Sequence, residues 1–167
     1  MSKIIPLLLF SLCCKLFIGT ALLTAAEPVE PMPNEKNALQ GQWLVTSFTR
    51  GNEANEGILK LELTFHFTEA GVTITSATNK DFPTLKRLTK IVTNTQPKLL
   101  DLAENEADFA SGKSVHEGIY QIEGDELTWA FTQQGLFEPA KGQRPADFDG
   151  SKESNLIVIK FKKQPAP

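Results

Sequence analysis

A strict alternation of apolar and polar side chains over residues 61–68 is the feature that most constrains the fold. The apolar positions are Leu61, Leu63, Phe65 and Phe67, and the positions between them are polar. A period of two puts all four apolar side chains on one face of a β-strand, which is typical of a sheet with one buried face. Residues 69–71 supply a turn before a second apolar run at 72–75, so the pair predicts a β-hairpin.

The same pattern of short runs between turn residues continues along the chain. Six further strands are predicted, at residues 43–49, 88–93, 98–103, 115–122, 127–132 and 156–161. Sustained helical periodicity is lacking, and only short helical turns are expected, near 53–59 or 104–109. Together with the hairpin, these runs make about eight strands, so the sequence predicts an all-β fold, an antiparallel up-and-down β-barrel.

The first 26 residues have the features of a signal peptide. Lys3 precedes an apolar stretch, and the small residues 24–26 favour cleavage after Ala26. Lys15 interrupts the apolar stretch, so an uncleaved membrane anchor is the less favoured alternative and the only predicted contact with a membrane. Cys13 and Cys14 both lie in this segment, so the mature chain would contain no cysteine. We therefore expect an exported protein, periplasmic or secreted.

The remaining chain is predicted to form one domain. Residues 27–37 contain three prolines among charged residues and predict an extended linker. The barrel domain is expected at 38–163, followed by a short tail at 164–167. The formal net charge is −3 and no basic patch is visible, which excludes a nucleic-acid-binding protein.

Four segments of the chain match a known pattern: residues 39–45, which contain Gly41-x-Trp43, residues 118–127, residues 144–148 and the closing run 156–162. Together they resemble an uncharacterised family of lipocalin-like domains that is abundant in planctomycete bacteria. The resemblance implies a lipocalin-like barrel in an exported bacterial protein, in which Gly41 and Trp43 form a structural closed end. It implies no activity. True lipocalins usually also have an arginine against this tryptophan and a helix after the last strand, whereas this chain has lysines there and no fitting helix.

No catalytic or metal-binding motif is complete, so we predict neither an enzyme nor a cofactor or metal. His66 falls on the polar face of its strand. The run Asp147–Ser151 fits an Asp-Gly turn better than a calcium loop. The acidic residues at 101, 104, 106 and 108 fit a solvated loop better than the paired carboxylates of a glycosidase.

Alternation places seven aromatic side chains inside the predicted barrel: Trp43, Phe65, Phe67, Tyr120, Trp129, Phe131 and Phe161. An eight-stranded barrel is just wide enough to be filled by side chains or to hold one small ligand, and large aromatics favour a filled core. If a ligand binds, we predict an apolar or amphipathic molecule. Its lining would be Phe67, Tyr120, Trp129 and Phe131, with His116 near the barrel mouth as a polar contact. The alternative is a filled scaffold module that binds an exported protein through the loops 104–114 and 134–154.

Overall fold

The computed structural model describes residues 35–134, 138–139, 142–151 and 153–165. The predicted signal peptide, most of the predicted linker and the last two residues of the tail lie outside the described residues. Helix α1 (Glu35–Leu39) includes residues 35–37, which the sequence pattern had assigned to the linker.

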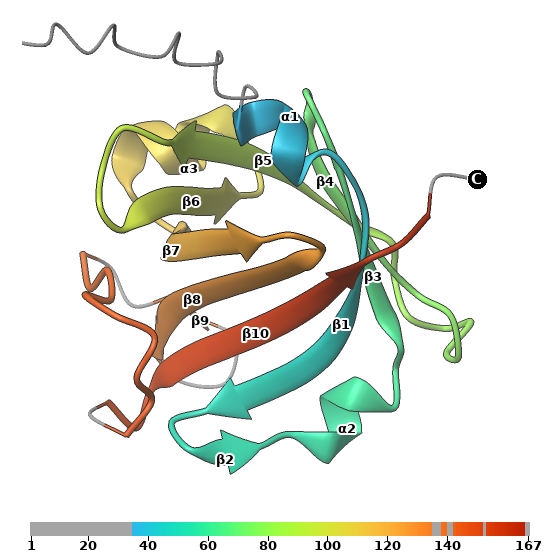
Figure 1. Ribbon diagram of the computed structural model, residues 1–167. Coiled ribbons are helices and arrows are strands. Elements are labelled where there is room, and N and C mark those ends of the chain that lie inside the picture. Colours follow the sequence, from blue (N-terminus) through green and yellow to red (C-terminus); the bar gives the residue numbers. More distant parts are fainter. Residues whose placement is uncertain (1–34, 135–137, 140–141, 152, 166–167) are drawn as a thin grey trace, which may run out of the picture. The chain divides into compact units, whose positions relative to one another are not determined.

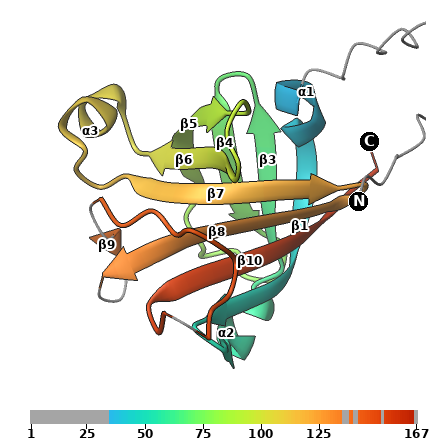
Figure 2. The same cartoon turned by 60° about the vertical axis from the view of Figure 1, so that its left-hand side comes forward.

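Eight antiparallel strands form a closed up-and-down barrel (Figures 1 and 2). They are β1 (Gly41–Arg50), β3 (Leu63–Thr68), β4 (Gly71–Ser76), β5 (Leu85–Val92), β6 (Lys98–Ala103), β7 (His116–Glu123), β8 (Glu126–Gln134) and β10 (Leu156–Lys163). Consecutive strands pair with one another, and β10 pairs with both β1 and β8, which closes the sheet. The all-β, eight-stranded, lipocalin-like fold class is therefore confirmed.

The remaining elements are short. The two-residue strands β2 (Glu53–Ala54) and β9 (Glu138–Pro139) pair with the ends of β1 and β8. Helices α2 (Glu56–Leu59) and α3 (Glu106–Ser111) occupy the two regions where helical turns were expected. Each begins after an asparagine whose side-chain oxygen accepts a backbone N–H three residues on, at 3.1 Å for Asn55 and 3.0 Å for Asn105.

A bulge in β1 determines which of its residues face the barrel interior. Trp43 and Val45 are buried, and the register with β10 then shifts between Val45 and Ser47. After this extra residue, Phe48 and Arg50 pair with Ile159 and Ile157 and lie on the inner face. Without the bulge, Phe48 and Arg50 would point to the outside.

The end of the barrel next to α1 is closed by Trp43. Its side chain is fully buried, and its indole Nε1 donates a hydrogen bond to the carbonyl of Leu39 at 2.8 Å. Lys163 Nζ lies 5.1 Å from the centroid of the indole ring and donates to the carbonyl of Ala38 at 3.0 Å. Lys163, one of the lysines that this chain has in place of the usual lipocalin arginine, thus contacts the tryptophan. Gly41, with φ of +111°, turns the chain from α1 into β1.

The outer face of β6, β7, β8 and β10 carries a second, smaller apolar cluster. Its buried members are Ile119, Ala130, Leu156 and Val158. Phe148, from the long connection before β10, packs against them. This connection therefore covers one side of the barrel.

Candidate functional site

A cavity of about 450 Å³ occupies the half of the barrel away from Trp43. Its deep walls are apolar side chains on the inner faces of β3, β4, β6, β8 and β10. These side chains are Phe65, Ile74, Leu102, Trp129, Phe131 and Ile159. The volume is in the range of small-molecule sites. The expectation of a filled core is therefore wrong for this half of the barrel, because the large buried side chains Phe65, Trp129 and Phe131 line the space without filling it.

The cavity opens at the end of the barrel that carries α2, which is the lower end in Figure 1, where β1 also ends. Ile58 of α2 and Phe82 of the β4–β5 connection line this end and are partly exposed, as are Arg50 and Gln133. Residues deeper in the cavity are buried. The gradient from exposed rim to buried base makes this a pocket with a mouth.

Three of the five predicted lining residues border the cavity. The ring centroids of Trp129 and Phe131 are 4.4 Å apart, and His116 lies edge-on to Phe131 at 4.9 Å. The other two, Phe67 and Tyr120, are buried but do not line the cavity. Because Phe67 pairs with Gly41 across β1 and β3, it belongs to the filled, closed half.

Trp129 is held against the wall by a hydrogen bond that crosses a neighbouring strand. Its Nε1 donates to the carbonyl of Leu100 on β6 at 3.0 Å, although Trp129 itself lies on β8. The indole crosses β7 at Gly118, where a Cβ atom would come within 2.2 Å of the indole nitrogen. Glycine at this position therefore permits the orientation of the largest side chain in the cavity wall.

His116 is uncharged at neutral pH. Burial disfavours its protonated form, and the positive charge of Arg87 disfavours it further, so that the pKa is lowered from 6.5 to about 4. Within the described part of the chain, its Nδ1 atom is buried without a hydrogen-bond partner. The imidazole thus contributes a neutral polar group to an otherwise aromatic wall.

Sequence reasoning missed the two arginines that line the cavity, Arg50 and Arg87. Arg50 was missed because the bulge in β1 reverses the alternation ahead of it. Arg87 was missed because it directly follows another charged residue, Lys86, so the predicted strand began only at Leu88. Neither position carries a local signal of burial.

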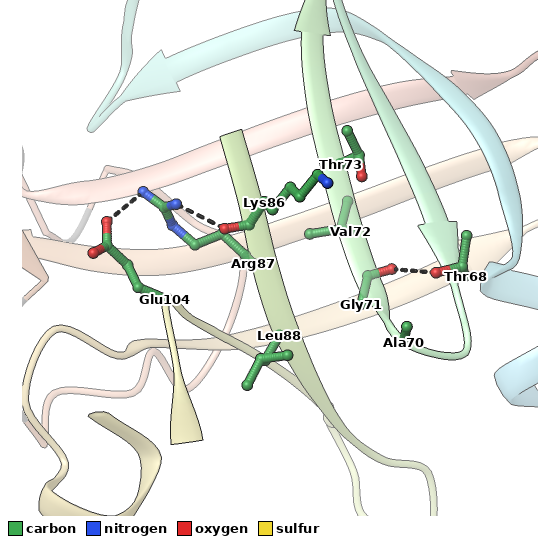
Figure 3. A pocket seen from close by; sticks show the side chains of 9 residues that line it. All are labelled: Thr68, Ala70, Gly71, Val72, Thr73, Lys86, Arg87, Leu88 and Glu104. Carbon is green, nitrogen blue, oxygen red and sulfur yellow. Dashed lines mark hydrogen bonds and ion pairs between the residues drawn. The ribbon is translucent and has the colours of Figure 1, made fainter. Parts of the chain in front are cut away.

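A second hollow of about 290 Å³ lies along β4 and β5 (Figure 3). Its lining includes Lys86, Arg87 and Glu104, and Arg87 borders both hollows. In Figure 3 the Arg87 guanidinium contacts Glu104 and the backbone carbonyl of Lys86. The mixed charges of this smaller hollow make the barrel cavity the better candidate for an apolar ligand.

The acidic residues after β5 have structural contacts. Asp101 is 8% exposed and binds Arg144 through two hydrogen bonds of 2.6 and 2.9 Å, so the prediction of a solvated position is wrong for it. Glu104 pairs with Arg87, and the Asp108 carboxylate accepts a hydrogen bond from the side-chain amide of Asn105, the N-cap residue of α3. His66 is exposed, as predicted. The turn at 147–151 closes through backbone N–H groups donating to Asp147 and Asp149.

Among the described residues, no three histidine, cysteine, aspartate or glutamate side chains gather closely enough to hold a metal ion. No helix in that part of the chain is long and apolar enough to cross a membrane. A scan against models of protein families, a search of curated proteins and a search of solved structures found no match.

Proposed function

We propose that this protein binds a small apolar or amphipathic molecule inside its barrel. The observation that carries the proposal is the cavity of about 450 Å³, with a buried apolar base and a partly exposed rim. Filling such a space removes apolar ligand surface from water, which stabilises a complex by about 25 cal/mol for each Å² buried. His116 and Gln133 supply the few polar groups that orient ligands in pockets of this kind.

The test is a titration with phenylnaphthylamine, an uncharged dye that fluoresces in apolar surroundings. Binding in the cavity places the dye beside Trp129, so the emission of this tryptophan should fall as the dye emission rises. Trp43 lies in the filled half and should respond less. A Trp129→Phe variant should retain dye binding and lose most of the tryptophan response.

Matched variants on one strand locate the bound dye. Leu102 lines the cavity, whereas Leu99 packs on the outer apolar cluster of the same strand, β6. Leu102→Trp should weaken dye binding by about tenfold or more, because it fills part of the cavity. Leu99→Trp should leave binding unchanged. Equal binding by the two variants would place the dye elsewhere, and no binding by the native protein would favour the protein-partner alternative.

We also propose that the protein is exported and that its mature form begins at Glu27. The support is the sequence pattern of residues 1–26, namely a lysine near the start, an apolar stretch and small residues before the cleavage position. Mass spectrometry of the protein from its own host tests this directly. A mass that includes residues 1–26 would show that the segment is retained.

A further inference from the structure

Positive charge is concentrated on the lining of the barrel cavity. Arg50 and Arg87 are its charged residues, and among the described residues that line it there is no carboxylate. The whole chain has a net charge of −3, so the cavity has the opposite sign to the protein. A site lined by one sign of charge with low-dielectric walls raises the local concentration of the opposite ion.

The guanidinium of Arg87 is bound to the protein by contacts that a ligand could replace. Its Nη2 lies 2.8 Å from Glu104 Oε1, and its Nη1 donates to the carbonyl of Lys86 at 2.9 Å. The Glu104 side chain is 60% exposed, and ion pairs with such exposed partners contribute little to stability. An anion held partly inside the cavity would be less screened by water and would compete well with Glu104.

The guanidinium of Arg50 makes no hydrogen bond or ion pair within the described part of the chain. The carboxylate closest to it in the sheet register is that of Glu53 on β2, which is exposed and forms no ion pair with it. Arginine guanidinium groups favour two-pronged hydrogen bonds to carboxylate or phosphate oxygens. Arg50 therefore has its hydrogen-bonding capacity available where it lines the cavity rim, although it also borders a separate surface hollow of about 540 Å³ that contains Glu53.

The properties of His116 show that the field of Arg87 reaches the cavity wall. Burial is the larger cause of the lowered pKa of this histidine and the positive charge of Arg87 is the second, so a positive charge is disfavoured at that point of the cavity. The same field favours a negative charge. A ligand anion near the rim would therefore face two cations and a neutral imidazole.

We infer that the ligand is a single-chain amphiphile with an anionic head group, whose chain lies along Trp129 and whose head group lies at Arg50 and Arg87. This inference rests on the proposed function, because it names the class of molecule that the same cavity takes. A straight alkyl chain matches the apolar base, and a carboxylate matches the forked guanidinium donors.

The experiment compares three twelve-carbon ligands that share one tail: dodecanoate, dodecanol and dodecylammonium, each displacing bound phenylnaphthylamine. Dodecanoate should bind at least about tenfold more tightly than dodecanol, which is the effect of charge-assisted hydrogen bonds. Dodecylammonium should bind most weakly. Shortening the carboxylate by one methylene should weaken binding about fourfold.

Charge variants assign the preference to the two arginines. Arg50→Gln and Arg87→Gln should each reduce dodecanoate affinity by about tenfold and leave dodecanol affinity unchanged. The control is Lys86→Gln, which removes a positive charge from the adjacent, exposed position on β5. Glu104→Gln should strengthen dodecanoate binding, because it frees Arg87 from its competing partner. Since Glu104 is on the surface, this variant remains informative if an arginine variant does not fold.

The outcomes separate the two proposals. If dodecanoate and dodecanol bind equally and neither Arg50→Gln nor Glu104→Gln changes that ratio, the anionic head group is wrong and the apolar cavity ligand stands. If the dye and all three amphiphiles fail to bind, the proposed function itself is wrong.

Discussion

Replacing Gly118 by alanine should cost several kcal/mol, although the change adds only one methyl group. The new Cβ would lie 2.2 Å from the indole nitrogen of Trp129 and 2.8 Å from two backbone carbonyl oxygens, those of Ala130 and Leu100. Contacts shorter than 3.0 Å do not occur for real Cβ atoms, so the indole or the strands must move. The two carbonyls belong to the adjacent strands and have little freedom, so the indole is the group that moves.

The magnitude follows from two terms. Overpacking a well-filled site costs about 1–3 kcal/mol. Moving the indole also breaks its hydrogen bond to the Leu100 carbonyl and leaves a buried donor unpaired, at about 1–3 kcal/mol more. Alanine restricts the unfolded chain more than glycine does and returns roughly 0.5 kcal/mol. We therefore predict that Gly118→Ala lowers the free energy of unfolding by about 2–5 kcal/mol, a large part of the ~5–15 kcal/mol of a typical domain.

Urea unfolding followed by circular dichroism measures this loss. The control is Gly124→Ala in the β7–β8 turn, where a Cβ meets nothing within 4 Å and only the φ of +60° is strained, at a cost of about 1–2 kcal/mol. Trp129→Phe removes the clashing nitrogen, so the double variant should recover at least about 1 kcal/mol relative to additivity. The reasoning is refuted if Gly118→Ala costs no more than Gly124→Ala and shows no coupling to Trp129→Phe.

Three further predictions concern other parts of the barrel. The pKa of His116 is about 4 in the folded state and 6.5 in the unfolded state, so the unfolded chain takes up the proton first as pH falls. When the pH falls from 7 to 4, the unfolding free energy of the native protein should therefore decrease by about 3 kcal/mol more than that of the His116→Gln variant. Equal decreases in the two proteins, measured by urea unfolding, would contradict this. Arg144→Met leaves the carboxylate of Asp101, whose side chain is 11% exposed, without its charge partner. It should cost about 2 kcal/mol, with part recovered by adding Asp101→Asn; no recovery would show that the ion pair is not the cause. Lys163→Met removes the ammonium group from the indole face at the closed end and should lower the unfolding free energy by about 1 kcal/mol, and an unchanged value in the same assay would argue against that contact.

The strands could be predicted because burial on one face is a local signal. In β3, three buried residues alternate with polar ones, and the predicted strand differs from the observed one only at its start. The predicted bounds of β6 agree with the structure. Turn residues between the runs marked the ends of the strands, so the spacing predicted the strand number, and closure was inferred from that number and from the lipocalin-like resemblance.

The cavity was harder to predict because its size depends on how side chains share the interior. Trp43, Phe67 and Phe161 all point inward, as alternation predicts, but they gather toward the closed half. Periodicity reports the face of a strand and not the height at which each side chain fills the barrel. Arg50 follows the bulge in β1, and Arg87 interrupts the apolar pattern of β5. These two cavity residues therefore carry the weakest sequence signal of an inward-facing position.

The ion pair between Arg144 and Asp101 shows a similar limit. The two residues are 43 positions apart, and their contact depends on the long connection before β10 folding back over the outer face of the barrel. The motif that contains Arg144 contributed to the family resemblance. Its physical role, anchoring that connection through a nearly buried carboxylate, becomes visible only in three dimensions.

The most direct test of the central claim is nuclear magnetic resonance of isotope-labelled isoleucine methyl groups during titration with dodecanoate. Ile74, Ile157 and Ile159 line the cavity, whereas Ile119 is equally buried in the apolar cluster on the outer face. A ligand inside the barrel should shift the first three signals in a saturable manner and leave that of Ile119 unchanged. Unchanged cavity signals at saturating dodecanoate, or shifts confined to the outer cluster, would contradict a ligand-binding barrel.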